Sequence, residues 1–178
     1  MTTPKLLGIS GSLRRDATNT KLVREAARLF GDSAFDLLDI RFPLYDGDDE
    51  AAEGVPQLVQ DAAARIAAAD AVIISTPEYN KGPSGVLKNA LDWISRTGGT
   101  PWNDKPVAVM SAAAGRAGGE RAQMVLRGFM VPFRPRILQG PEMHLASSSE
   151  AFDAEGRLVD ERYIRDLSQL MTSLRGMI

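Results

Sequence analysis

Residues 10–20 read Ser-Gly-Ser-Leu-Arg-Arg-Asp-Ala-Thr-Asn-Thr, between a short apolar run at residues 6–9 and a helix-like pattern at residues 21–30. A strand, a loop of glycine, hydroxyl and arginine residues, and then a helix form an arrangement that suits phosphate binding. The free N–H groups and the positive dipole at the start of such a helix attract an anion. Gly11 permits close backbone approach, and the planar guanidinium of Arg14 can hold phosphate oxygens. The stretch therefore predicts a phosphate site in an α/β fold.

The spacing within this loop excludes two common phosphate motifs. A P-loop requires a lysine after its second glycine, and no lysine stands there. The dinucleotide fingerprint requires three glycines, whereas Gly8 and Gly11 are followed by Leu13 and Arg14. An arginine and several hydroxyls suit a terminal phosphate dianion, although an ordinary turn with a threonine or asparagine helix cap stays open as an alternative. The side chains that could add neutral hydrogen bonds are Ser10, Ser12, Thr18, Asn19 and Thr20.

Strand and helix patterns alternate along the rest of the chain, which predicts a doubly wound α/β fold. Apolar, β-branched runs such as residues 71–75 are typical of strands buried on both faces of a parallel sheet. We expect one domain, 1–178, with a five-stranded parallel sheet and helices on both faces. The expected strands are 5–10, 34–39, 71–75, 107–112 and 136–139, the expected helices are 19–30, 57–68, 84–96, 118–130 and 160–174, and residues 41–55 are expected to form a loop.

Two further loops follow predicted strands and should meet the first loop at the carboxyl edge of the sheet. Residues 76–83 are stiffened by two prolines, and their single aromatic side chain suits a flat heterocycle. Residues 111–119 are small and glycine-rich, which leaves room for a ring system against the backbone. A proline-rich turn and a flexible turn are the simpler alternatives. The candidate residues in these loops are Pro77, Glu78, Tyr79, Asn80, Ser111 and Gly115, and Arg116 is a candidate partner for a second anion.

Composition narrows the classes of function. The formal net charge is −2, which does not suggest a nucleic-acid or membrane-surface partner. The chain contains no cysteine, which excludes disulfides, thiolate nucleophiles and zinc ribbons and fits a reducing compartment. The chain has a single histidine, His144, and its sequence contains no Gly-x-Ser-x-Gly motif, so a histidine-based hydrolase is not predicted. No bound metal is expected, and the expected location is the cytoplasm.

Taken together, the three loops resemble the NAD(P)H-dependent FMN reductase family of flavodoxin-like proteins, which includes quinone and chromate reductases. The resemblance covers nearly the whole chain, and the Pro-Glu-Tyr-Asn tetrapeptide with the helix after it is its most specific part. It is carried by Gly11-Ser12-Leu13-Arg14, Asn19, Pro77-Glu78-Tyr79-Asn80, the segment Leu87–Trp93, Gly115 and Gly118-Gly119.

The resemblance implies a flavodoxin-like three-layer fold and roles for individual residues. Ser12, Arg14 and Asn19 would hold the FMN phosphate, with Thr18 and Thr20 as helpers. Residues 77–80 would border the isoalloxazine ring, and Ser111 and Gly115 would lie along its other side. Many family members carry serine where this chain has Ala17, so one phosphate hydrogen bond would be absent unless Thr18 or a backbone N–H replaces it. A neutral hydrogen bond contributes only ~0.5–1.5 kcal/mol, so binding should survive.

The implied activity is hydride transfer from NADPH or NADH to bound FMN, and then electron transfer to a quinone, free flavin, an azo dye or chromate. The flavin would carry the chemistry, so no protein side chain is expected to be catalytic. A flavodoxin-type electron carrier, a flavin-binding regulatory module and a hydrolase on the same architecture stay open as alternatives. We also expect a homodimer or homotetramer, because the helix at residues 84–96 carries a wide apolar face that includes Leu87, Leu91, Trp93 and Ile94.

Overall fold

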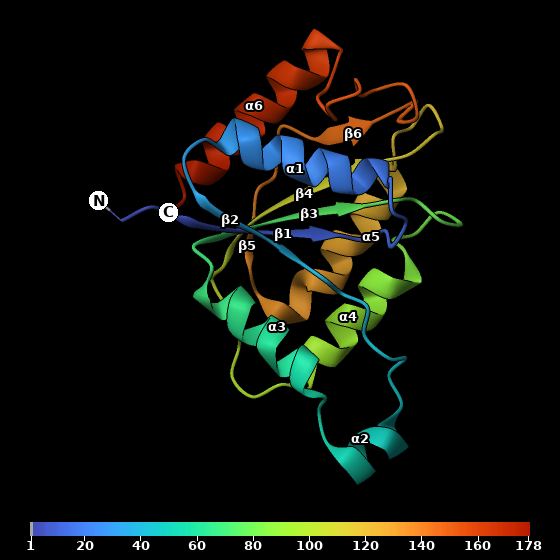
Figure 1. Ribbon diagram of the computed structural model, residues 1–178. Helices are drawn as coiled ribbons and strands as arrows, with labels where there is room; N and C mark the ends of the chain where they lie inside the picture. The colour runs from blue at the N-terminus through green and yellow to red at the C-terminus, as the bar shows by residue number, and fades with distance from the viewer. Residues whose placement is uncertain (1) are drawn as a thin grey trace.

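Strand β1 (Lys5–Ser10) lies between β2 and β3 in a parallel sheet whose strands follow the order β2-β1-β3-β4-β5, with β6 also pairing with β4 (Figure 1). The computed structural model describes residues 2–178. This strand order is the flavodoxin-like one, and it changes direction between β1 and β3. The remaining elements are α1 (Thr18–Phe30), β2 (Ala34–Leu38), α2 (Gly47–Glu53), α3 (Gln57–Ala68), β3 (Ala71–Thr76), α4 (Gly85–Ser95), β4 (Pro106–Ala112), α5 (Glu120–Met130), η1 (Val131–Phe133), β5 (Arg136–Ile137), β6 (Met143–Leu145) and α6 (Glu161–Arg175).

Helices cover both faces of the sheet, which confirms the predicted three-layer architecture. Helices α1 and α6 lie on one face, and α3, α4 and α5 lie on the other (Figure 1). Side chains of β3 alternate between these two cores: Ala71 and Ile73 pack with α1 and α6, whereas Val72 and Ile74 pack with α3 and α4. Burial of both faces explains why this strand reads as a continuous apolar run in the sequence.

Gly8, in the middle of β1, lets α1 approach the sheet closely. A Cβ atom at this position would stand 2.5 Å from Cγ1 of Val23 and 2.9 Å from Cε2 of Phe35. Both neighbours belong to the core that α1 forms with the sheet. Glycine at residue 8 therefore sets the distance between β1 and α1.

The prediction that residues 41–55 form a loop was wrong in part, because these residues contain helix α2. The carboxylate of Asp46 accepts a hydrogen bond from the N–H of Asp48 at 2.8 Å, and acidic residues fill the first turn, where the helix dipole favours them. Gly54, with φ of 78°, ends the helix. Glu50 binds Arg96 at 2.9 Å and accepts a hydrogen bond from the Tyr45 hydroxyl at 2.8 Å, and these bonds lower the pKa of its carboxyl group.

The expected fifth strand is also interrupted, so the sheet has six strands rather than five. Residues 136–137 form β5 beside the start of β4, and Met143–Leu145 form β6 beside its end. Both short strands lie on the same edge of β4. The intervening residues leave the sheet, and Pro141 among them has no N–H to offer a strand partner. The fifth strand position is thus occupied by two short strands, the second of which brings His144 opposite Ser111.

Candidate cofactor-binding site

The three predicted loops meet at the carboxyl ends of β1, β3 and β4, where they surround a cavity of about 910 Å³. Pockets for small molecules and cofactors usually measure ~300–1,000 Å³. Residues 12–21, 77–81 and 112–121 contribute to its walls, and Ser148 and Ser149 complete them. The sequence prediction that these loops converge on one site is therefore confirmed.

The structure brings most, but not all, of the predicted site residues to this cavity. Ser10 and Thr20 instead line an adjoining cavity of about 230 Å³, on the side of the loop that faces β2. Ser111 is fully buried beneath the surface of the site, and Asn80 lies in the turn beyond Tyr79. The predicted residues that line the main cavity are Ser12, Arg14, Thr18, Asn19, Pro77, Glu78, Tyr79 and Gly115.

The start of α1 forms the end of the cavity that is best suited to an anion. Its N-cap residue, Ala17, supplies no side-chain hydrogen bond, and the first turn of the helix contains no acidic residue. The N–H groups and the positive end of the dipole are thus open to a ligand. Within residues 2–178, Arg14 makes no side-chain hydrogen bond or ion pair, so its guanidinium is free to bind an anion. Ser12 and Thr18 line the same end of the cavity.

The fold of this loop depends on buried hydrogen bonds behind it. The N–H of Gly11 donates to the carbonyl of Ser75 at 2.7 Å, and the Ser84 hydroxyl donates to the Gly11 carbonyl. A Cβ atom on Gly11 would stand 3.1 Å from Oγ of Ser84, so the loop lies close against the loop after β3. The Thr20 hydroxyl donates to Oγ of Ser10 at 2.8 Å. Ser10 and Thr20 therefore help to shape this loop from the side that faces away from the main cavity.

Asn19 has a structural role that the sequence analysis did not anticipate. Its side chain is 3% exposed, and its Oδ1 accepts hydrogen bonds from the Ser75 hydroxyl at 2.7 Å and the Ala112 N–H at 3.0 Å. Its Nδ2 donates to the carbonyl of Ala112 at 2.9 Å. Asn19 thus joins α1 to the ends of β3 and β4 directly below the site.

The second loop is a tight turn that displays one aromatic side chain. Tyr79 and Gly82 exchange backbone hydrogen bonds of 2.9 and 3.1 Å, while Asn80 and Lys81 adopt positive φ angles of 49° and 70°. The Tyr79 side chain is 53% exposed at the cavity, where it can contact a planar ligand. The carboxylate of Glu78 accepts a hydrogen bond from the N–H of Ala122 at 3.2 Å, which caps the N-terminal turn of α5.

The charges around the cavity favour an anionic ligand. Five cationic side chains line it, against three acidic ones, namely Asp16, Glu78 and Glu120. This surplus raises the local concentration of phosphate-bearing molecules. The cationic residues are Arg14, Lys21, Lys81, Arg116 and Arg121. Over residues 2–178, histidine, cysteine and carboxylate side chains form no group that could hold a metal ion.

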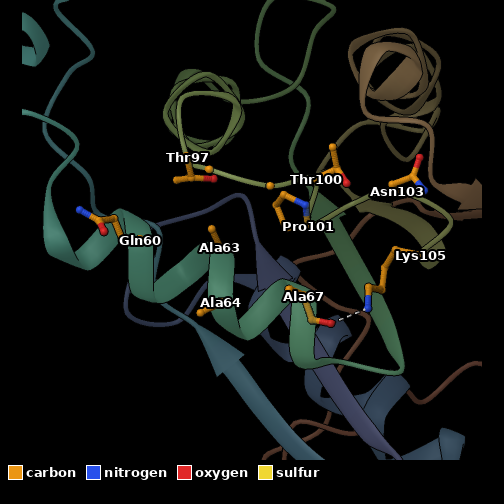
Figure 2. A pocket seen from close by; sticks show the side chains of 11 residues that line it. Gln60, Ala63, Ala64, Ala67, Thr97, Thr100, Pro101, Asn103 and Lys105 are labelled. Atoms are coloured by element: carbon orange, nitrogen blue, oxygen red, sulfur yellow. Dashed lines mark hydrogen bonds between the residues drawn. The ribbon is translucent and has the colours of Figure 1, made fainter.

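A second cavity, of about 500 Å³, lies between α3 and the segment that follows α4 (Figure 2). Lys105 extends along it and donates hydrogen bonds from Nζ to the carbonyl oxygens of Ala67, at 3.0 Å, and Ala69. Its amine therefore caps the C-terminal end of α3, where the helix dipole favours a cation. Burial lowers the pKa of this amine. The cavity lies near the amino ends of β3 and β4, away from the three loops.

None of the helices within residues 2–178 has both the length and the apolar character required to cross a membrane.

Comparison with known proteins agrees with this geometry. Residues 4–150 match the family model for NADPH-dependent FMN reductases. The chain is 42% identical over 173 residues to an NAD(P)H-dependent FMN reductase of Pseudomonas aeruginosa, which covers 96% of this chain and 93% of that protein. It is 33% identical over 180 residues to a quinone reductase of Escherichia coli, covering 98% of this chain and 95% of that protein.

A solved structure provides an independent comparison. The flavoenzyme FerB, an NAD(P)H:(acceptor) oxidoreductase from Paracoccus denitrificans, superposes with a TM-score of 0.87 and 32% identity. The match covers 98% of this chain and 97% of that chain, so the shared fold includes all three loops. The family match and the identity to these relatives show that this chain belongs to the NADPH-dependent FMN reductase family.

Proposed function

We propose that this chain is an FMN-dependent oxidoreductase that takes hydride from NADPH or NADH and passes electrons to a quinone or another small acceptor. The observation that supports this most is the cavity itself, in which an uncapped helix start and a free arginine stand opposite a stiff aromatic loop and a glycine-rich loop. This donor set fits a ligand with a phosphate at one end and a planar ring at the other. The family match and the named relatives support the same activity.

In this proposal the phosphate of FMN lies at the start of α1. Arg14 would supply a charge-assisted hydrogen bond, and Ser12 and Thr18 would supply neutral ones. Ser10, Asn19 and Thr20 hold the loop in shape through the bonds described above. Ala17 leaves the N-terminal N–H groups of α1 uncapped by any side chain, so these groups remain available to phosphate oxygens.

The ring system would lie between the loop at Pro77–Asn80 and the glycine-rich loop that includes Gly115. Ser111 would act from below, because its hydroxyl is fully buried and donates to the Gly118 carbonyl at 2.6 Å. When bound, FMN supplies hydride acceptance and onward delivery of two electrons. The protein orients the ring and offers backbone N–H groups to its polar edge. No side chain of this chain has to form or break a covalent bond.

The mouth of the cavity is suited to two substrates that bind in turn. Tyr79 presents half of its surface there and can contact a nicotinamide or quinone ring. Lys21, Arg116 and Arg121 lie beside it and can attract the phosphates of a dinucleotide. We therefore expect ping-pong kinetics, with the same exposed ring face serving both substrates. Free flavin, azo dyes and chromate are further candidate acceptors.

A non-catalytic electron carrier or flavin-binding module is the second candidate for this fold. Steady-state consumption of NADPH or NADH, measured at 340 nm with a benzoquinone in excess, distinguishes it from an enzyme. We expect rapid turnover that depends on added quinone and on bound FMN. A protein that binds FMN tightly but does not oxidise either nicotinamide would be a carrier.

We further propose that residues 1–178 form one domain that assembles as a homodimer or homotetramer in the cytoplasm. The apolar face of α4 does not support this assembly, because Leu87, Leu91, Trp93 and Ile94 are all buried within the single chain. The support comes instead from the neighbouring surface. It consists of exposed apolar side chains of α5 and η1 and the apolar cavity beside them, namely Met124, Val125, Val131, Phe129, Pro132 and Phe133.

Light scattering over a dilution series tests the assembly. We expect a mass of two or four chains, each of 19.2 kDa, at micromolar concentration. Replacement of Val131, which is 71% exposed, by aspartate should shift the population toward the monomer. A fully active monomer at every concentration would contradict the proposed assembly without affecting the proposed chemistry.

A further inference from the structure

A chain of buried hydrogen bonds runs beneath the glycine-rich loop and starts from Gln123 on α5. The side chain of Gln123 is 1% exposed, and its Nε2 donates to the Met143 carbonyl at 2.7 Å and to Oγ of Ser111 at 2.9 Å. The Ser111 hydroxyl in turn donates to the Gly118 carbonyl at 2.6 Å. One side chain thus connects β6, β4, α5 and the loop between β4 and α5.

Only one orientation of the Gln123 amide lets Nε2 donate both of these hydrogen bonds. Both acceptors stand on the Nε2 side, while Oε1 is buried and has no partner among residues 2–178. Reversing the amide would place Oε1 against the Met143 carbonyl, where two acceptors would oppose each other. Leaving the Oε1 carbonyl buried and unpaired costs ~1–3 kcal/mol. The two hydrogen bonds that Nε2 donates therefore have to offset this cost.

The loop has little freedom to move against the sheet. A Cβ atom on Gly118 would stand 2.5 Å from the carbonyl oxygen of His144, and one on Gly119 would stand 2.7 Å from Cβ of Ser111. Both glycines have positive φ angles, 59° and 92°. The end of the loop therefore rests directly on the backbone of β6 and on the side chain that Gln123 holds.

The other part of the loop lines the cavity. Gly115, Arg116 and Ala117 belong to its wall, and their backbone N–H groups make no hydrogen bond within the described part of the chain. Donors of this kind favour negative charge on a bound ring, and they act best when they are held in place before the ligand arrives. The position of these peptide groups depends on where Gly118 is anchored, because they are the three residues that directly precede it in the chain.

We propose that Gln123 is a positioning residue for the cofactor: it anchors the 115–119 loop through Ser111 and so sets the placement of the N–H groups that meet the edge of the flavin ring. The proposal rests on the proposed function, since it assigns the ring to this loop. Gln123 touches neither cofactor nor substrate. Its effect should be larger on the reduced, more negative form of the flavin than on the oxidised form.

The test compares the wild-type protein with Gln123→Met, which keeps the length of the side chain and removes both donors. Gln57→Met, the same substitution at the exposed first residue of α3, is the matched control. We expect Gln123→Met to weaken FMN binding to the apoprotein three- to tenfold, to make the midpoint potential of bound FMN more negative, and to speed amide exchange at residues 113–119. The control should change none of the three.

Ser111→Ala removes the next hydrogen bond of the series, from the Ser111 hydroxyl to the Gly118 carbonyl. It replaces Gln123→Met in the test if that variant folds poorly. It should reproduce the shift in potential, and the double variant should add little to either single one, because both act on the same link. A variant that loses stability while its FMN affinity, potential and loop exchange match the wild type would overturn the role of Gln123. Failure of the wild-type protein to bind FMN at all would instead overturn the proposed function.

Discussion

Replacement of Asn19 by leucine should destabilise the protein strongly even when no cofactor is present. The two side chains are similar in size, so the change removes polarity rather than volume. Three buried hydrogen bonds are lost, to the Ser75 hydroxyl and to both backbone groups of Ala112. At ~1 kcal/mol for each bond, the loss amounts to about 3 kcal/mol, and the unpaired groups of Ala112 can increase it. For a domain of this size, that corresponds to a fall in melting temperature of roughly 6–12 °C.

Urea unfolding of the apoprotein, followed by tryptophan fluorescence, measures this effect. The matched control is Thr18→Ala, which removes one partly buried hydrogen bond of 3.1 Å between the Thr18 and Ser148 hydroxyls. The control should lose less than about 1 kcal/mol. If Asn19 served only to bind phosphate, the apoprotein would be unaffected; a loss below about 1 kcal/mol in Asn19→Leu, or equal losses in both variants, would refute the structural role argued here.

Three further substitutions test other parts of the account. Arg14→Ala should weaken FMN binding roughly tenfold to a hundredfold, and more than Ser12→Ala, since charge-assisted bonds are worth ~1.5–3 kcal/mol; fluorescence titration giving the reverse order would contradict this. Ala17→Ser should stabilise the apoprotein by about 1 kcal/mol, because it supplies the side-chain cap that α1 lacks, and unchanged thermal unfolding would count against it. Gly8→Ala should cost ~1–3 kcal/mol, because the new methyl group meets Val23, and a neutral result in urea unfolding would show that α1 can shift.

The sheet and its ligand edge could be predicted because their signals are local and strong. Residues 71–74 are apolar on both faces of a strand, and such a run needs helices on both sides of the sheet. Parallel strands then place their following loops along one edge, so the meeting of the three loops follows from strand polarity alone. The loop at residues 10–20 could be placed at this edge for the same reason, since Gly11 and Arg14 stand between a strand and a helix.

The parts that escaped prediction depend on contacts between distant segments. Helix α2 is seven residues long and buries none of them, so its formation depends on the Asp46 cap and on Glu50 reaching Arg96, not on apolar periodicity. The fifth strand position is divided because β5 pairs with the start of β4 and β6 pairs with its end. The sequence does not show this pairing. Asn19 was predicted as a phosphate ligand rather than as a buried link between elements, and Gln123 looks like an ordinary polar residue of an amphipathic helix. Only the fold shows that both are buried and point toward β4.

Anaerobic reduction of the FMN-loaded protein tests the central claim most directly. The FMN absorbance near 450 nm is followed after mixing with NADPH, and then with NADH, in a stopped-flow instrument, and a benzoquinone is added once the reaction is complete. The account predicts rapid bleaching with at least one of the two nicotinamides and full return of the absorbance when the quinone is added. Bound FMN whose absorbance neither nicotinamide bleaches, under conditions in which dithionite does, would contradict the assignment of this chain as an oxidoreductase.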